Sequence, residues 1–206
     1  MRVRIIPRMS ESKVLGRTLA VLHAVVSEEL GHAGRDLDAS LSPAFRAALA
    51  EGLGPARLHP RAWARELLAP LRAPGDHGRV GRELADRELS RGPYRFALRA
   101  LRPDGLGAVL PALIGRAFPR TSLRIEPRAP RGCTLVWSQC EGFDDALWSL
   151  QEGMARRVLE LAGRHRYEWR REGGGRDGAT EMRCVTTWAD PDETPTLPPP
   201  PLPVAP

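Results

Sequence analysis

Cysteine and histidine are the side chains in this sequence best suited to metal binding or nucleophilic chemistry, and there are 3 cysteines and 5 histidines. Cys133, His165 and Cys184 lie in stretches where apolar and polar residues alternate, and the alternation puts all three on one face. Thiolate and imidazole are good zinc ligands, so a metal- or cofactor-dependent protein is one interpretation. The alternative is two buried thiols and a hydrogen-bonded histidine in a core, because the spacing supplies neither local pairing nor a fourth ligand. We predict no cofactor.

Aromatic residues share that face. Trp137, Tyr167, Trp169 and Trp188 combine apolar rings with polar edges, which suits a pocket for an apolar or planar ligand. A packed aromatic core is the alternative, and the sequence alone leaves both open. The residues predicted to line the pocket are Trp137, Phe143, Leu147, Tyr167, Trp169, Cys184 and Trp188.

Catalytic motifs are missing from the sequence. It contains no GxSxG, P-loop, HExxH or dinucleotide fingerprint. Asp144 and Asp145 are adjacent and therefore point in different directions, which favours a role at the start of a helix over paired acid–base chemistry. The glycine-rich GGGRDG links two predicted strands and opens no helix, so it does not fit a phosphate cradle. We therefore expect a protein without enzymatic activity.

Four predicted strands and one helix must position these side chains. Period-two alternation predicts strands at SLRIEP, CTLVWS, HRYEWR and residues 182–188, and helical spacing predicts a helix from about Phe143 to Ala162. Short connections make each strand pair an antiparallel hairpin. Every strand has one apolar face, so the sheet needs a cover on one side only. The predicted class is α+β: an N-terminal helical bundle followed by a β-β-α-β-β antiparallel four-stranded sheet.

Residues 12 to 119 have the spacing of helices. Leu15, Leu19, Leu22, Val26 and Leu30 form one apolar stripe that stops at Gly31. Pro60 is expected to open a later helix, and Pro111 to kink or split the last one before the strands. These helices would supply the rest of the cover.

The ends of the chain differ in composition from its middle. We expect an N-terminal extension at 1–11, a single ligand- or partner-binding domain at 12–188 and a disordered Pro-rich tail at 189–206. No apolar run approaches the roughly 20 residues of a membrane helix, and the start lacks signal-peptide features, so we expect a cytoplasmic protein. Arginine supplies all basic residues except Lys13, but without a dense block, which does not favour nucleic-acid binding.

Four segments carry a family resemblance. VLGRTLAVLHAVVSEELG, LRPDGLGAVLPALIGRAFP, GFDDALWSLQEGMARRVLELAGRHRYEW and RCVTTW, within residues 14–188, resemble the superfamily that includes haem-NO-binding domains, 4-vinyl reductase domains and TRAPP trafficking subunits. A paralogous myxobacterial domain of unknown function is the nearer likeness. The resemblance implies a domain that encloses a small molecule or offers a surface to a protein.

The haem-binding branch of that superfamily uses a helical histidine and a Tyr-x-Ser-x-Arg signature. PYRFALR contains Tyr94 but has neither the serine nor the arginine at that spacing, so the resemblance does not carry haem binding to this chain. We expect a sensor, adaptor or interaction domain that binds a small hydrophobic molecule or a protein partner, which includes a second copy of the chain. A weak nucleic-acid binder is the remaining alternative.

Overall fold

The computed structural model describes residues 13–33, 35–73, 75–90, 106–128, 131–162 and 166–189. The predicted N-terminal extension, His165 and all of the predicted tail except Ala189 lie outside these ranges. The described helices are α1 (Gly16–His32), α2 (Pro43–Glu51), α3 (Ala62–Leu68), α4 (Asp76–Ser90), α6 (Leu106–Ala117) and α7 (Asp145–Leu161), with a short 3-10 turn at Asp38–Ser40. The strands are β1 (Lys13–Leu15), β2 (Leu58–Pro60), β3 (Ser122–Arg128), β4 (Gly132–Ser138), β5 (Tyr167–Gly174) and β6 (Met182–Trp188).

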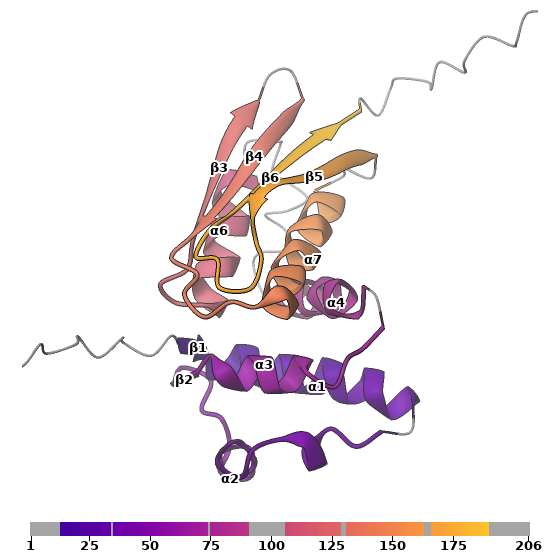
Figure 1. Cartoon of the computed structure of the whole chain (residues 1–206), viewed down its shortest axis with the longest axis vertical. Helices are drawn as coiled ribbons and strands as arrows, with labels where there is room; N and C mark the ends of the chain where they lie inside the picture. Colours follow the sequence, from indigo (N-terminus) through magenta and orange to yellow (C-terminus); the bar gives the residue numbers. More distant parts are fainter. Residues whose placement is uncertain are drawn as a thin grey trace, which may run out of the picture.

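The α+β class predicted from the sequence is confirmed. The larger sheet has the strand order β3-β4-β6-β5, with antiparallel neighbours, and α6 and α7 lie on one side of it (Figure 1). Cross-strand register pairs Leu135 with Cys184 and Trp169 with Thr186, so these four side chains share one face. We call this the inner face, because it turns toward the helices. Arg124, Arg170 and the other alternate residues point to the opposite side.

Helix α7 begins where its sequence predicts. The Asp144 carboxylate accepts a hydrogen bond from the backbone N–H of Leu147 at 3.0 Å, which satisfies one of the free amides of the first turn. The backbone N–H of the next residue, Asp145, donates a hydrogen bond to the Asp177 carboxylate in the β5–β6 loop, at 2.9 Å. Both predicted helix-start residues therefore fix the N-terminus of α7 and its contact with the sheet.

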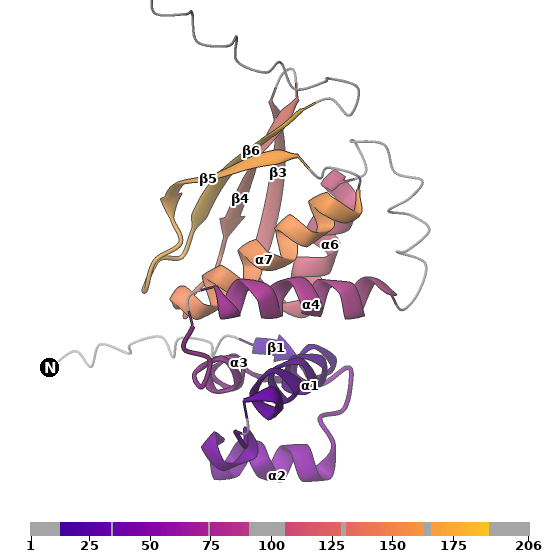
Figure 2. The same ribbon diagram turned by 90° about the vertical axis from the view of Figure 1, so that its right-hand side faces the viewer.

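Helices α4 and α7 approach each other at glycines. A Cβ atom added to Gly153 would lie 2.0 Å from the carbonyl oxygen of Gly78, and one added to Gly81 would lie 2.2 Å from that of Leu150. The two backbones are thus in direct contact, which larger residues at these positions would prevent. Figure 2 shows α4 between α7 on one side and α1 and α3 on the other. The depth at which α7 sits over the sheet depends on this crossing.

The N-terminal half differs from the prediction at two places. Lys13–Leu15 and Leu58–Pro60 form a two-stranded antiparallel sheet, whereas helical spacing had placed Leu15 on a helical stripe and Pro60 at a helix start. Three-residue strands are too short to show alternation, so period analysis cannot find them. Pro111 lies inside α6, and the helix continues as one element from Leu106 to Ala117.

A buried arginine links the two halves. Arg61, 3% exposed, donates from Nη1 to the carbonyl of Glu141 at 2.5 Å and from Nη2 to Thr121 Oγ1 at 3.3 Å. Its guanidinium lies 4.7 Å from the centroid of the Phe143 ring. Burial lowers the pKa of Arg61, and the Glu141 carbonyl, the Thr121 hydroxyl and the face of the Phe143 ring partly offset the cost of burying its charge.

Candidate functional site

The seven residues predicted to line a pocket fall into two groups by burial. Trp137, Leu147 and Cys184 are fully buried and Phe143 is 2% exposed, so these four pack in the core. The other three, Tyr167, Trp169 and Trp188, are half-buried. All the strand residues of the set lie on the inner face.

The set extends along the whole sheet and does not converge on one point. Tyr167 pairs with Trp188 at one end, while Trp137 pairs with Met182 toward the other. Phe143 lies beyond the end of the sheet at which Trp137 is placed. Its ring packs edge-on against that of Phe118, with the two centroids 5.7 Å apart. Trp137 and Trp169 meet edge-to-face with centroids 6.5 Å apart. The structure therefore brings Trp137 and Trp169 together and separates Phe143 from Tyr167 and Trp188.

Several buried polar atoms beneath the inner face have no hydrogen-bond partner among the described residues. They are both amide atoms of Gln151, the indole nitrogens of Trp137 and Trp169, Oγ1 of Thr186 and Nε of Arg156. Gln151 and Thr186 are fully buried. Native interiors pair the great majority of their buried polar atoms, and each unpaired one costs free energy. Three of these atoms belong to inner-face residues of the sheet, and the others belong to Gln151 and Arg156 on α7, the helix that covers it.

Near these atoms, charged side chains of α7 and β5 form hydrogen bonds and ion pairs with one another. Glu152 accepts a hydrogen bond from Arg171 Nε at 2.7 Å and lies 3.6 Å from Cys184 Sγ. Arg156 reaches the same carboxylate only at 3.9 Å, and its guanidinium lies over the Trp169 ring, 5.2 Å from the centroid. The alternating sequence pattern identifies Cys184 and Trp169 but neither Glu152 nor Arg156, which occupy adjoining turns on the sheet side of α7.

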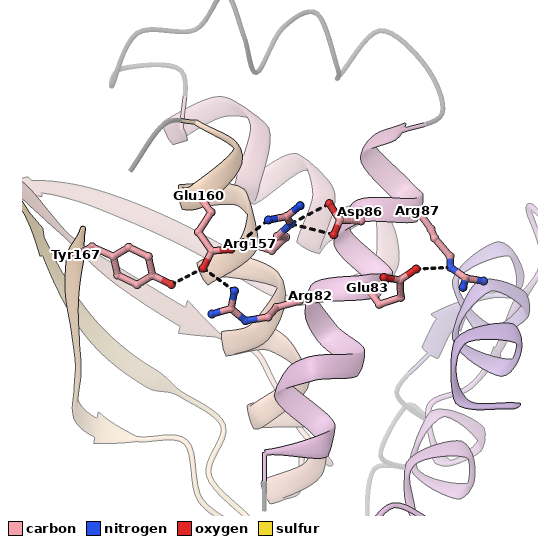
Figure 3. A network of polar contacts seen from close by, with 7 residues as sticks. All are labelled: Arg82, Glu83, Asp86, Arg87, Arg157, Glu160 and Tyr167. Atoms are coloured by element: carbon pink, nitrogen blue, oxygen red, sulfur yellow. Dashed lines mark hydrogen bonds and ion pairs between the residues drawn. The ribbon is translucent and has the colours of Figure 1, made fainter. Parts of the chain in front are cut away.

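A second polar network joins β5 to α7 and α4 (Figure 3). Tyr167 donates to Glu160 at 3.1 Å, Arg82 reaches the same carboxylate at 2.5 Å, and Arg157 contacts both oxygens of Asp86 at 2.8 and 2.9 Å. Burial raises the pKa of Glu160, but hydrogen bonds from Arg82 and Tyr167 outweigh it and the net shift is downward. Burial raises the pKa of Tyr167. These charges satisfy one another and hold the end of α7 in place.

An open groove of about 480 Å³ lies between α1, α4 and α7, next to this network. The charged side chains that line it already form ion pairs with one another: Arg79 pairs with Glu29 at 2.6 Å, and Arg157 pairs with Asp86. A polar ligand would have to displace these existing ion pairs, so the groove is a weaker candidate site than the region beneath the sheet.

Two of the three cysteines lie near each other on the sheet. Cys133 pairs with Thr186 and Cys184 with Leu135, so the two thiols are diagonal neighbours on the inner face, and His165 lies outside the described residues. Burial raises the pKa of Cys133 to about 11, which keeps the thiol neutral. In the described part of the chain no three His, Cys, Asp or Glu side chains gather as a metal site would require. The metal interpretation therefore has no support beyond the shared face.

Comparison with known proteins gives the fold. The sequence matches no protein-family model and no curated protein. Solved structures of H-NOX (haem-NO-binding) domains are similar. An H-NOX variant from K. algicida, in the unliganded Fe(II) form, has TM-score 0.61 at 11% identity over 86% of this chain and 97% of that one. An oxygen-binding H-NOX domain related to soluble guanylate cyclases has TM-score 0.59 at 14% identity, over 85% and 95%. At these identities the likeness establishes a shared H-NOX-like fold.

The histidines that the structure describes do not fit a haem. A haem in this fold needs an axial ligand facing the interior, and three of the described histidines are engaged elsewhere: His23 with Asp38, His59 with the carbonyl of Leu53 and His77 with that of Leu68. His32 is exposed at the end of α1. None of these four lies on α6, α7 or the inner face. Tyr94, in a segment without the Tyr-x-Ser-x-Arg signature, falls outside the described residues. The chain shares the H-NOX-like fold, and within the described ranges no histidine is placed to hold a haem.

No described helix combines the length and apolar character that crossing a bilayer requires.

Proposed function

We propose that this protein is a non-enzymatic sensor domain that binds a small, mainly apolar molecule between α7 and the inner face of the large sheet. The observation that carries the proposal is Gln151, a fully buried side chain whose two amide atoms have no partner among the described residues. A primary amide offers two donors and two acceptor lone pairs, and leaving it unpaired costs about 1–3 kcal/mol. A bound molecule with one or two polar atoms would recover that cost.

The surroundings of Gln151 support an apolar ligand. It lies on the buried face of α7, one turn after Leu147 and two turns before Val158, both fully buried. Trp137 contributes a large ring and an unpaired indole N–H on the facing sheet. Apolar walls with a few polar groups that fix orientation are typical of small-molecule sites. The H-NOX-like fold supports the same kind of role, since the similar domains are described as binding oxygen or containing iron.

Catalysis is not part of the proposal. Glu152 and Glu160, the carboxylates nearest the region, are each held by an arginine at 2.7 and 2.5 Å. The three thiols are buried, and burial raises their pKa values, so none is a ready nucleophile. A sensor also needs a reader of its ligand state, which we propose to be a protein partner or a second copy of the chain.

A fluorescence titration with N-phenylnaphthylamine, a neutral apolar dye that brightens in apolar surroundings, tests the function. Wild type should bind the dye with a saturable, one-to-one curve. Gln151→Leu should bind it at least several-fold more weakly, since the polar anchor is lost. Met154→Leu, an apolar exchange on the same buried helix face, is the matched control and should leave the affinity close to wild type. The proposal would be contradicted if the wild-type protein did not bind the dye, or if no apolar competitor displaced the bound dye.

A further inference from the structure

The geometry points to a ligand with one carboxylate group, bound where Arg156, Trp169 and Thr186 meet at the edge between α7 and β5. This inference rests on the proposed function and adds the chemical class of the ligand: an apolar organic acid.

The three side chains lie at one place. Trp169 on β5 and Thr186 on β6 are cross-strand partners on the inner face, so their side chains are neighbours. Arg156 on α7 stacks its guanidinium over the Trp169 ring at 5.2 Å from the centroid. Three different elements therefore contribute to one small surface.

Each of the three has a buried polar atom with no partner among the described residues: Arg156 Nε, Trp169 Nε1 and Thr186 Oγ1. Thr186 is fully buried. The first two atoms only donate hydrogen bonds, and a hydroxyl can donate as well. The complement to three donors on neighbouring side chains is a group rich in acceptors. A carboxylate, with two oxygens and about four lone-pair sites, meets that requirement, whereas an amine does not.

The local charge also favours an anion. The Glu152 carboxylate is bound tightly by Arg171 at 2.7 Å and only loosely by Arg156, at 3.9 Å. Two guanidinium groups thus share one carboxylate. Tyr167 and Cys184 are two further titratable neighbours of Arg156, and burial raises the pKa of each, so neither adds negative charge at neutral pH. The balance at Arg156 is positive and partly shielded from water.

The orientation of the ligand follows from the two tryptophans. The Arg156 side chain is 36% exposed, so a charged head group bound there stays close to solvent. On the inner side, Trp169 meets Trp137 edge-to-face at 6.5 Å, and Trp137 is fully buried. The acid group would therefore lie at the edge beside Arg156 while the apolar part extends toward Trp137, which avoids burying the charge deeply.

A displacement assay with matched competitors tests the inference. N-phenylnaphthylamine is the reporter, and naphthylacetate and naphthylethanol are competitors that share the ring system and differ in the charged group. We expect the acid to displace the reporter about tenfold better than the alcohol, as charge-assisted hydrogen bonds are roughly twice as strong as neutral ones. Arg156→Gln should abolish this preference. Thr186→Val and Trp169→Phe, which keep shape or ring and remove the polar atom, should each reduce it.

The control is Arg170→Gln, which removes an arginine of the same strand from the opposite face, where its side chain is 74% exposed; it should keep the tenfold preference. Circular dichroism verifies folding, and Thr186→Val decides the outcome if Arg156→Gln does not fold. If the reporter binds but acid and alcohol compete equally, or Arg156→Gln and Thr186→Val both retain the preference, the inference is overturned and the proposed function stands. If the reporter does not bind wild type, both are overturned.

Discussion

Gly153→Ala should destabilise the protein strongly, although alanine is the better helix former. An alanine Cβ at this position would lie 2.0 Å from the carbonyl oxygen of Gly78, about 1.4 Å closer than the 3.4 Å at which ordinary contact begins. Both groups are close to the backbone, so no change of rotamer can relieve the overlap and α4 and α7 must separate. Overpacking of this kind costs about 1–3 kcal/mol or more, against a helix-propensity gain of about 1 kcal/mol.

Gly78→Ala is the matched control, because it adds the same methyl group at the same helix crossing. Its Cβ would lie 3.8 Å from the carbonyl oxygen of Ser149, an ordinary contact. We expect a neutral effect or a stabilisation of up to about 1 kcal/mol.

Thermal unfolding followed by far-UV circular dichroism measures both variants. With about 2–4 °C per kcal/mol for a chain of this size, a net loss of about 2 kcal/mol lowers the Tm of Gly153→Ala by about 4–8 °C. The same variant should bind N-phenylnaphthylamine more weakly, since α7 carries Gln151. Equal Tm values for the two alanine variants, or a Gly153→Ala variant as stable as wild type, would refute the close contact between the backbones of α4 and α7. They would also refute the claim that this contact sets how far α7 lies from the sheet.

Three further outcomes follow from the buried charges and thiols. Because burial raises the pKa of Cys133 to about 11 and of Cys140 to about 12, and raises that of Cys184, we expect no reaction of native thiols with Ellman's reagent at pH 8 and full reaction in denaturant. The pKa of Glu160 is below its ordinary value of 4.5, so the ionised carboxylate stabilises the folded protein fully above pH 4.5, and this contribution is lost as the pH falls below that value. In urea titrations below pH 4.5, Glu160→Gln should therefore lose less stability with falling pH than wild type does. Arg61→Lys should lower the free energy of unfolding by about 2 kcal/mol in the same titrations. A lysine ammonium group cannot make both hydrogen bonds of the planar guanidinium and also stack on the Phe143 ring.

The sheet and its helix could be predicted because their sequence signals are local and strong. Alternation assigned Cys133, Trp137 and Cys184 to one face, and the register confirms this. Asp144 has the spacing of a helix start and does cap α7. The strand pair β1–β2 could not be predicted, since three residues cannot establish a period and the pairing joins segments far apart in the chain.

The candidate site was predictable only in part. Alternation identifies which side chains face inward, but it does not say whether their polar atoms find partners, which depends on tertiary contacts. Gln151 had a signal in the sequence, since a glutamine stands one turn after Leu147 in an apolar stripe. Arg156 had none, because an arginine on a helix is usually solvated and only the structure places it over Trp169.

The central claim, that a small molecule binds between α7 and the inner face, is tested most directly by NMR of the tryptophan indole N–H groups. The five tryptophans give separate signals that Trp→Phe variants assign. With naphthylacetate at concentrations that displace the fluorescent reporter, we predict shifts for Trp137 and Trp169, whose indole nitrogens have no described partner.

Two tryptophans serve as internal controls in the same spectrum. Trp148 donates to the carbonyl of Arg176 at 3.2 Å, and Trp63 stacks on Phe45 at 4.7 Å in the N-terminal half; both signals should stay largely in place. Shifts confined to Trp63, or none at Trp137 and Trp169 once the reporter is displaced, would contradict the account.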